Sequence, residues 1–429
     1  MYWLCGATMR HNRGVMTNLH RRCAPGRVLS AAVLLVGVSG TTACDLLPTY
    51  SLVTTGQQPN SVATVEAQPT SSTPVNVTVP VIVQANNGRL VDVTVTGPKG
   101  PVPGTFDTQS KRWQADNQAL AFGSTYHVAA TAVDARGREV QLQDSFTTVE
   151  PSSVFKAEVF PAEGEPVGVG MPITVTFDRS IENRAEVERA LRIVTPMPIE
   201  GAWAWTSNRQ VQFRPRTYWP GSMDAEVHLD LRGVQAKDGV YGARDSVHTV
   251  SFGPSMVTQV NAKTFTATVL RDGTVARTIP ITTGKSGWET RSGVKVIMSK
   301  ERTRVMDAST GGTSRNDPEY YRLLVEYAMR VTDSGEFVHA APWSVGYQGR
   351  ANVSHGCIGM STDNAQWLYE QTLVGDVVEV RGTGREQDLG NGITLWNESW
   401  AQWLARSANG PVLTTVRPDL AFDVTGVSG

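Results

Sequence analysis

Alternating hydrophobic and polar positions recur along most of the chain and predict short β-strands. Residues 75–79, 125–133 and 173–177 all follow this pattern, and turn sequences rich in Gly, Asn and Asp separate the runs. Strict alternation places every second side chain on one face of a strand, so that one face packs inward. Two successive groups of such strands, 75–149 and 150–255, predict two antiparallel β-sandwich modules.

The second module is similar to the bacterial Ig-like domains of envelope proteins. The similarity lies in Phe160-Pro161 followed by Val175-Thr176-Phe177-Asp178. Neither module groups residues that would suggest chemistry. The histidines of the two modules occur singly in strand-like runs, so we interpret them as ordinary strand residues.

A third domain is expected over residues 256–382. Strands are predicted at 264–270 and 274–282, and one helix is predicted at 362–372, where Ala365 and Leu368 share a face. The expected fold class is therefore mostly β: two Ig-like sandwiches followed by a β-rich domain with one main helix.

Residues 383–429 predict a small C-terminal extension. After a Gly-rich stretch, Trp396, Trp400 and Trp403 follow at intervals of four and three, which places them on one face of a helix. We expect this face to dock on a neighbouring domain, and we expect a loose tail after about residue 407.

The N-terminal region, residues 1–44, reads as an export signal. Basic residues precede an apolar run at 28–40, which is too short to span a bilayer. Thr41-Thr42-Ala43-Cys44 then resembles a lipobox, in which Cys44 would be lipidated; simple cleavage and a retained signal anchor are the alternatives. Residues 45–74, rich in Ser, Thr, Gln and Pro, predict a flexible tether.

Charge and cysteine content narrow the function. The chain of 429 residues has a formal net charge of −1, so there is no basic excess to suggest nucleic-acid binding. Of its four cysteines, Cys5 and Cys23 precede the apolar run. If Cys44 is lipidated, Cys357 remains as a lone thiol, which is either a buried hydrophobe or a reactive group.

The sequence around Cys357 favours a reactive thiol. His339 ends a predicted strand eighteen residues before Cys357, and a returning loop of that length can bring imidazole and thiol together. We expect the amides of Gly356 and Cys357 to form an oxyanion hole, and the following helix to lower the pKa of the thiol. An inert thiol, or a metal site of His339, His355 and Cys357 that lacks a fourth ligand, are the alternatives.

Ser354-His355-Gly356-Cys357-Ile358, together with residues 337–346, resembles the catalytic domain of L,D-transpeptidases, in particular the mycobacterial type with two Ig-like domains. The resemblance implies that Cys357 is the acylated nucleophile and His339 its base, with no cofactor and no metal. It also implies that His355 is structural and is oriented by the carbonyl of Ala340 or a neighbour.

The same resemblance implies several substrate contacts. Tyr321 and Met306 would lie on a lid over the acyl site, and Trp343 would shape the edge of the pocket. Ser354 and Ala340 would complete the substrate-binding side. Gly359 departs from the family pattern, because many members have Asn or Arg there to bind substrate carbonyls.

The implied reaction is a cross-link between two meso-diaminopimelate residues of peptidoglycan, with tetrapeptide stems as both donor and acceptor. Carbapenems would acylate the same thiol. A hydrolase that trims stem peptides in the manner of an L,D-carboxypeptidase, and a non-catalytic wall scaffold, are the alternatives. The enzyme is expected on the outer face of the cell membrane, lipid-anchored and facing the wall.

Overall fold

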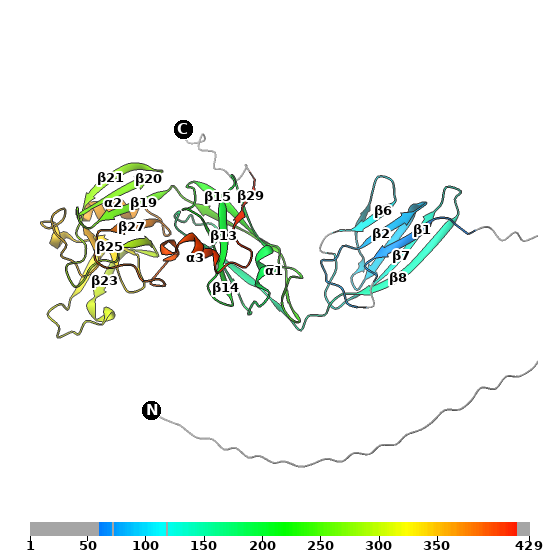
Figure 1. The fold of residues 1–429 in the computed structure, drawn as a ribbon, viewed down its shortest axis with the longest axis horizontal. Helices are drawn as coiled ribbons and strands as arrows, with labels where there is room; N and C mark the ends of the chain where they lie inside the picture. The colour runs from blue at the N-terminus through cyan, green and yellow to red at the C-terminus, as the bar shows by residue number, and fades with distance from the viewer. Residues whose placement is uncertain (1–59, 71–72, 117–118, 418–429) are drawn as a thin grey trace, which may run out of the picture. The chain divides into compact units, whose positions relative to one another are not determined.

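The computed structural model describes residues 60–70, 73–116 and 119–417. The signal, the proposed lipidation site at Cys44 and most of the expected tether lie outside the described residues. The described chain is mostly β, as predicted, and its three α-helices are short (Figure 1). They are α1 (Arg184–Arg189), α2 (Thr362–Gln371) and α3 (Trp400–Leu404). None of the helices described here is long and apolar enough to cross a membrane.

Module 1 is a sandwich of two four-stranded sheets built from residues 64–147. One sheet has the order β1-β2-β6-β5 and contains β1 (Thr64–Gln68), β2 (Ile82–Asn86), β6 (Arg112–Ala115) and β5 (Gly104–Phe106). The other has the order β4-β3-β7-β8 and contains β4 (Gly100–Pro101), β3 (Arg89–Gly97), β7 (Thr125–Val133) and β8 (Glu139–Thr147). Trp113, Tyr126 and Phe146 lie in its core. Strand β1 falls in the segment expected to be a tether, and its antiparallel pairing with β2 makes these residues part of the sheet.

Module 2 follows over residues 153–252 and has two main sheets and a small third one. The first has the order β10-β11-β14-β13-β28, and its module strands are β10 (Ala157–Phe160), β11 (Ile173–Phe177), β14 (Gln210–Pro215) and β13 (Glu200–Trp205). The second has the order β18-β15-β12-β29, with β18 (Ser246–Phe252), β15 (Met223–Leu229) and β12 (Leu191–Thr195). The small sheet comprises β16 (Gln235–Lys237), β17 (Val240–Gly242) and β9 (Ser153–Phe155). Alternating buried side chains of the main sheets, such as Val175, Val211 and Val227, form the core between them.

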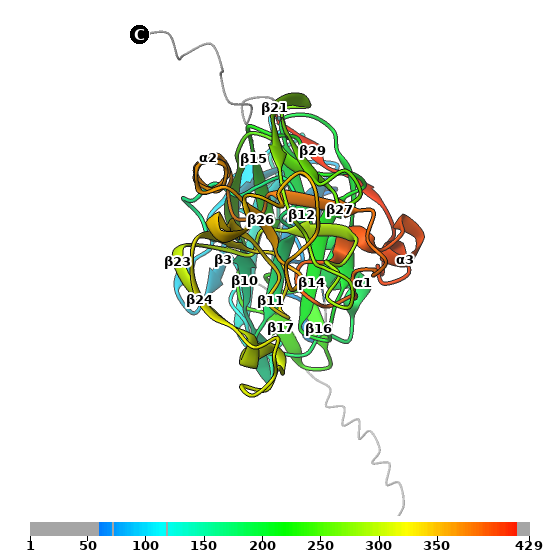
Figure 2. The same ribbon diagram turned by 90° about the vertical axis from the view of Figure 1, so that its left-hand side faces the viewer.

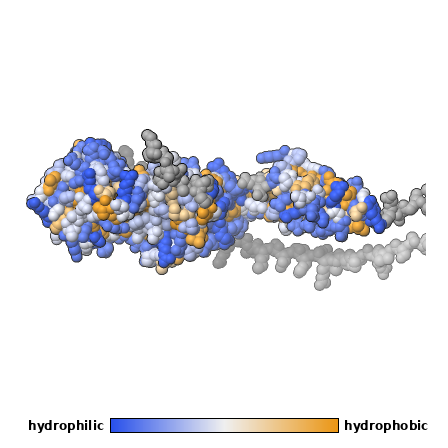
Figure 3. Space-filling model, turned by 90° about the horizontal axis from the view of Figure 1, so that it is seen from above, coloured by the Kyte–Doolittle hydropathy of each residue, from blue (hydrophilic) through white to orange (hydrophobic). Residues whose placement is uncertain are grey.

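The third domain, residues 256–381, also contains two sheets. A five-stranded sheet has the order β21-β20-β19-β27-β22, with β21 (Thr274–Pro280), β20 (Thr266–Arg271), β19 (Met256–Asn261), β27 (Val377–Arg381) and β22 (Gly293–Val296). A four-stranded sheet has the order β23-β24-β25-β26, with β23 (Ser299–Asp307), β24 (Arg322–Arg330), β25 (Phe337–Ala340) and β26 (Ile358–Met360). Helix α2 buries Ala365 and Leu368 and packs against β24 and β25. Figure 2 shows α2 at the periphery of the view, above β23 and β24. Hydrophobic positions are dispersed among hydrophilic ones on the face seen in Figure 3.

The C-terminal extension, residues 383–417, packs on module 2. Trp403 is fully buried, and its indole N–H donates to the Ala202 carbonyl at 3.0 Å. The guanidinium of Arg214 lies 5.0, 5.3 and 4.9 Å from the ring centroids of Trp396, Trp400 and Trp403. These tryptophans gather as expected, but Trp396 belongs to a separate 3-10 turn, Leu395–Asn397, and not to α3.

The expectation of a loose tail after residue 407 was wrong for the part that the structure describes. Strand β28 (Val412–Leu413) pairs with β13, and β29 (Thr415–Val416) pairs in parallel with β12. Each short strand pairs on one side and thereby covers an edge of module 2 that β13 or β12 would otherwise present. A sequence as short as these two strands carries too little alternation to predict a partner more than 210 residues away.

Candidate active site

The nucleophile candidate is positioned by two neighbouring parallel strands. Val338 of β25 lies opposite Ile358 of β26, and His339 lies opposite Gly359. Cys357 directly precedes β26, so it lies beside Phe337 at the start of β25. The loop of eighteen residues therefore returns the thiol to the strand that carries His339, as the sequence predicted.

Cys357 and His339 line one cavity of about 220 Å³. Six of the other residues singled out from the sequence line it too: Met306, Tyr321, Trp343, Ser354, His355 and Gly359. Ala340, a predicted substrate contact, does not line it. Gly356 lines an adjoining cavity instead, and Tyr321, Met306 and His355 contribute to both. The structure thus brings the predicted residues together around the thiol.

The thiol of Cys357 is in an environment that favours its neutral form. The pKa of Cys357 is raised to about 12, chiefly by burial; the Phe337 N–H acts in the opposite direction, and the negative charge of Glu336 adds to the rise. The sulfur lies 3.9 Å from the Gly335 carbonyl oxygen, and no hydrogen bond joins it to His339 among the described residues. The expectation of a lowered pKa was wrong: β26 separates Cys357 from the start of α2, so the helix does not act on the thiol.

His339 is held as a neutral base. Its Nδ1 lies 2.7 Å from the Ala340 carbonyl oxygen, which can only accept, so Nδ1 carries the proton. Burial lowers the pKa of His339, opposed by this hydrogen bond, which favours the neutral imidazole. Nε2 is left free to take a proton. The family resemblance had implied that the Ala340 carbonyl or a neighbour orients His355. In the structure this carbonyl orients His339 instead.

His355 has a different partner, which the sequence did not reveal. Its Nε2 lies 2.6 Å from Glu319 Oε2, and the same oxygen accepts from Lys285 Nζ at 2.7 Å. Hydrogen bonds from Lys285 and His355 lower the pKa of Glu319. The ring of His355 also meets Trp288 edge-on, with centroids 4.9 Å apart. Glu319 lies in an irregular loop, where no periodicity marks a functional position.

The backbone before the thiol forms a tight turn. Gly356 has a φ of 118°, which other residues rarely adopt. Its N–H donates to Ser354 Oγ at 3.2 Å, and Ser354 Oγ donates to the Cys357 carbonyl at 2.6 Å. Thr290 Oγ1 donates to the Gly356 carbonyl at 2.7 Å. The Gly356 amide expected to bind an oxyanion is thus hydrogen bonded to Ser354, which closes the turn.

Three predicted substrate contacts surround the thiol. Tyr321 and Met306 belong to a small apolar cluster that also touches Cys357. Burial raises the pKa of Tyr321 to about 12, so its hydroxyl remains a proton donor at neutral pH. Trp343 is 54% exposed, and its ring centroid lies 6.0 Å from that of His339. It therefore stands at the mouth of the cavity, as expected for a residue at the edge of the pocket.

Gly359 occupies a position that has little room for a side chain. Its N–H and carbonyl both bond to Thr282 at 2.9 Å. A Cβ there would lie 3.0 Å from Ala341 Cβ and 3.1 Å from Thr282 Cγ2. Ala341 and Thr282 therefore pack closely against the backbone of Gly359. The Asn or Arg found in many family members would require both side chains to move.

The metal alternative finds no support in the geometry. Within residues 60–70, 73–116 and 119–417, no three His, Cys, Asp or Glu side chains gather closely enough to hold a metal ion. His355 is engaged with Glu319, while His339 is hydrogen bonded to a backbone carbonyl.

Comparison with known proteins agrees with the fold. The family model "L,D-transpeptidase catalytic domain" matches residues 255–380, and "Bacterial Ig domain" matches residues 72–235. L,D-transpeptidase 2 of Mycobacterium tuberculosis is 37% identical over 337 residues, which are 78% of this chain and 82% of that protein. L,D-transpeptidase 5 of the same organism is 32% identical over 340 residues, 77% of this chain and 74% of that protein.

Solved structures include an LD transpeptidase in complex with imipenem, which is 41% identical and covers 52% of this chain and 97% of that one, with a TM-score of 0.45. The family resemblance and the mostly β fold predicted from the sequence are confirmed by the family models and by L,D-transpeptidases 2 and 5. With a relative 37% identical over more than two thirds of its length, the chain belongs to the L,D-transpeptidase family and is an acyltransferase.

Proposed function

We propose that the protein cross-links peptidoglycan by joining two meso-diaminopimelate residues through a thioester on Cys357. The observation that carries this proposal is the shared cavity of Cys357 and His339, in which Nδ1 of the imidazole is anchored and Nε2 is free. A thiol and a neutral imidazole in one pocket form the pair required for nucleophilic acyl transfer.

The first half-reaction forms the acyl-enzyme. His339 Nε2 takes the thiol proton, and Cys357 Sγ attacks the carbonyl carbon between meso-diaminopimelate and the terminal D-Ala of a tetrapeptide stem. The C–N bond then breaks, and the imidazolium returns the proton to the departing amine of D-Ala. The anchored Nδ1 keeps Nε2 available for both transfers. The hydroxyl of Tyr321, which keeps its proton, is suited to bind the developing oxyanion.

The second half-reaction forms the cross-link. The side-chain amine of another stem's diaminopimelate attacks the thioester carbon, His339 accepts the amine's proton, and the C–S bond breaks. The proton passes to the sulfur, so that the neutral thiol is restored. Because the thiol's pKa is raised by burial, its neutral form is the stable state between turnovers.

Acylation by a carbapenem, followed by intact-mass spectrometry, tests the nucleophile and the base. We expect a single adduct on the full chain, none on Cys357→Ala, and acylation slowed at least about 100-fold in His339→Ala. His127→Ala, an exposed histidine of module 1, is the matched control and should acylate normally. An adduct that persists in Cys357→Ala would refute the assignment. With stem peptides, a dimer mass indicates transpeptidation, whereas a tripeptide indicates hydrolysis.

We also propose that the protein is a lipoprotein on the outer face of the cell membrane, anchored through Cys44. The support is the lipobox-like Thr41-Thr42-Ala43-Cys44 after an apolar run. Metabolic labelling with a fatty-acid analogue should mark the wild-type protein and leave Cys44→Ser unlabelled. Equal labelling of both would exclude Cys44 as the anchor.

A further inference from the structure

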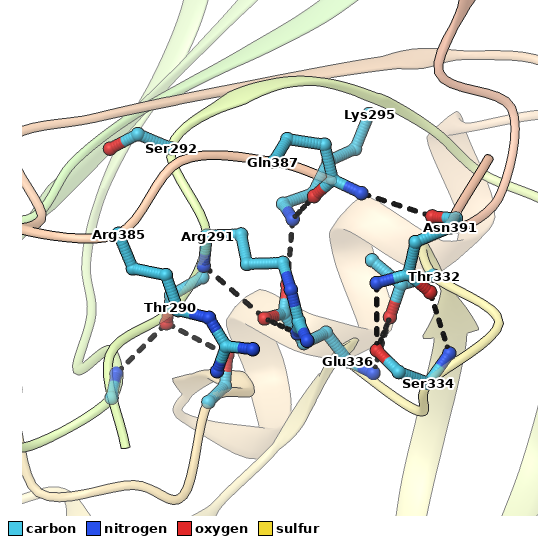
Figure 4. Close-up of polar contacts among 12 residues, drawn as sticks. Thr290, Arg291, Ser292, Lys295, Thr332, Ser334, Glu336, Arg385, Gln387 and Asn391 are labelled. Atoms are coloured by element: carbon cyan, nitrogen blue, oxygen red, sulfur yellow. Dashed lines mark hydrogen bonds and ion pairs between the residues drawn. The ribbon is translucent and has the colours of Figure 1, made fainter. Parts of the chain in front are cut away.

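A buried charge cluster surrounds Glu336, close along the chain to the segment that contacts the nucleophile; Figure 4 shows the side chains of Arg291, Lys295 and Gln387 around it. Glu336, the residue before β25, is 6% exposed, and Lys295 of β22 is fully buried. Lys295 Nζ lies 2.6 Å from Glu336 Oε2, and Arg291 Nη1 lies 2.8 Å from Oε1. The Arg291 backbone N–H also donates to Oε1, at 3.2 Å. Both oxygens of this carboxylate are thus committed to cationic partners.

The C-terminal extension completes the cluster. Gln387 Oε1 accepts from Lys295 Nζ at 2.5 Å, and Asp388 Oδ2 accepts from Arg291 Nε at 2.8 Å. These two residues lie outside the segment matched by the catalytic-domain family model, which ends at residue 380. The environment of Glu336 therefore depends on a part of the chain beyond that domain.

The extension also holds the turn that precedes Glu336. Asn391 Oδ1 accepts from the Ser334 N–H at 2.8 Å, and Asn391 Nδ2 donates to Ser334 Oγ at 2.9 Å. The Gly392 N–H donates to Asp333 Oδ2 at 2.9 Å. Residues 333–336 are thus fixed from one side by the extension and from the other by Lys295 and Arg291.

This turn touches the nucleophile. The Gly335 carbonyl oxygen is 3.9 Å from Cys357 Sγ. A Cβ placed on Gly356 would lie 3.7 Å from Glu336 Cγ. After burial, the charge of Glu336 is among the causes that raise the pKa of Cys357. A buried ion cluster is often no more stabilising than apolar residues of the same shape, so stability alone does not explain its place beside the thiol.

We propose that Glu336 is a positioning residue for the nucleophile, and that its charge, balanced by Arg291, Lys295 and the C-terminal extension, sets the ionisation of Cys357. Glu336 contacts no substrate in this scheme. It acts by holding the Gly335 carbonyl beside the sulfur and by placing a partly neutralised anion behind the thiol. The proposal rests on the proposed role of Cys357 as nucleophile.

The test is the pH dependence of alkylation of Cys357 by iodoacetamide in the full chain, followed by mass spectrometry of the peptide that carries Cys357. Glu336→Gln keeps the shape and removes the negative charge, so the thiol should ionise at lower pH. We expect alkylation at neutral pH to accelerate about tenfold, because one pKa unit is a tenfold change in thiolate.

Arg291→Gln should act in the opposite direction. It removes a cation but leaves Glu336 bonded to Lys295 and to the backbone N–H of residue 291. The charge of Glu336 is then less balanced, and alkylation should slow about threefold with the profile displaced to higher pH. Glu200→Gln, which removes a partly exposed carboxylate paired with Arg216 in module 2, is the matched control and should leave the profile unchanged.

A purely structural role predicts changes of the same sign in both variants, or an unshifted profile, and either result overturns the proposal. If Glu336→Gln does not fold, the Arg291→Gln profile decides by itself. Alkylation requires neither substrate nor transpeptidation. A failure of the wild-type chain to react with a carbapenem, with opposite shifts in the alkylation profiles, would therefore refute the proposed function while this inference stands.

Discussion

Module 1 and module 2 are both β-sandwiches, but they differ in where their strands come from. Every strand in the two sheets of module 1 lies between residues 64 and 147. The two main sheets of module 2 each gain an edge strand, β28 and β29, from residues 412–416. Module 2 therefore depends on chain that follows the third domain, whereas the sheets of module 1 are complete in sequence. The tryptophan-rich extension contacts both the third domain, which carries the candidate active site, and module 2. It adds no strand to the sheets of module 1.

Direct contacts strengthen this tie. The N–H groups of Gly168 and Gly170 in module 2 donate to the Val374 and Gly375 carbonyls of the third domain at 2.8 Å. A Cβ on Gly168 would lie 2.1 Å from the backbone nitrogen of Asp376, so only glycine permits this approach. Module 2 and the third domain are thus joined both by backbone contact and by the extension.

The largest expected effect follows from removing the extension. Truncation after Gly390 removes the buried Trp403 and both added strands, and we expect a loss of at least about 5 kcal/mol of unfolding free energy. Urea unfolding monitored by tryptophan fluorescence would measure it. An unchanged midpoint would mean that the extension does not hold module 2, and the comparison between the modules would fail.

Two tryptophan substitutions sharpen the comparison. Trp403→Ala and Trp113→Ala each empty a core site and should each cost about 3–5 kcal/mol. Hydrogen exchange measured peptide by peptide separates them: Trp403→Ala should expose strand β13 and also β22, whereas Trp113→Ala should act within residues 64–147. Carbapenem acylation should be unchanged in Trp113→Ala. Faster exchange of β22 in that variant would contradict the independence of module 1.

The smallest expected effect is on the pH dependence of the free energy of unfolding. Burial raises the pKa of Asp376 to about 7, against the Leu373 N–H and the charge of Lys300, which lower it. The folded pKa thus exceeds the unfolded value of 3.8. The protein therefore loses stability as the pH rises from about 4 through 7, where the native state must release a proton that it holds more tightly. Asp376→Asn should flatten this dependence and be more stable at pH 8 by about 1–4 kcal/mol. Parallel pH profiles of urea unfolding for the two proteins would disprove it.

Much of the fold followed from the sequence because local patterns determine it. Alternation predicted the sandwiches, the helix at 362–372 corresponds to α2, and the spacing of the tryptophans placed them together around Arg214. The motif around Cys357, together with the family resemblance, predicted most of the singled-out residues that share the cavity, although Gly356 and Ala340 do not line it. For the strands, the helix and the tryptophans, the deciding information lay within a few residues along the chain.

The rest depended on contacts between distant segments. The partner of His355 is Glu319, in an irregular loop, and the partner of Lys295 is Gln387, 92 residues away. The raised pKa of Cys357 depends on burial, which the flanking residues do not reveal. The family pattern likewise assigned the Ala340 carbonyl to His355 and not to His339, because only the geometry shows which histidine lies beside that carbonyl.

The parallel pairing of β29 with β12 has a consequence for the order of events in biogenesis. A ribosome makes the chain from the N-terminus, and module 1 can complete its sheets when residue 147 has emerged. The last edge strands of module 2, at residues 412–416, are made more than 260 residues after the end of module 1 at residue 147. The extension therefore completes module 2 late: this module and the third domain reach their final stability together, only after residue 416 has been made.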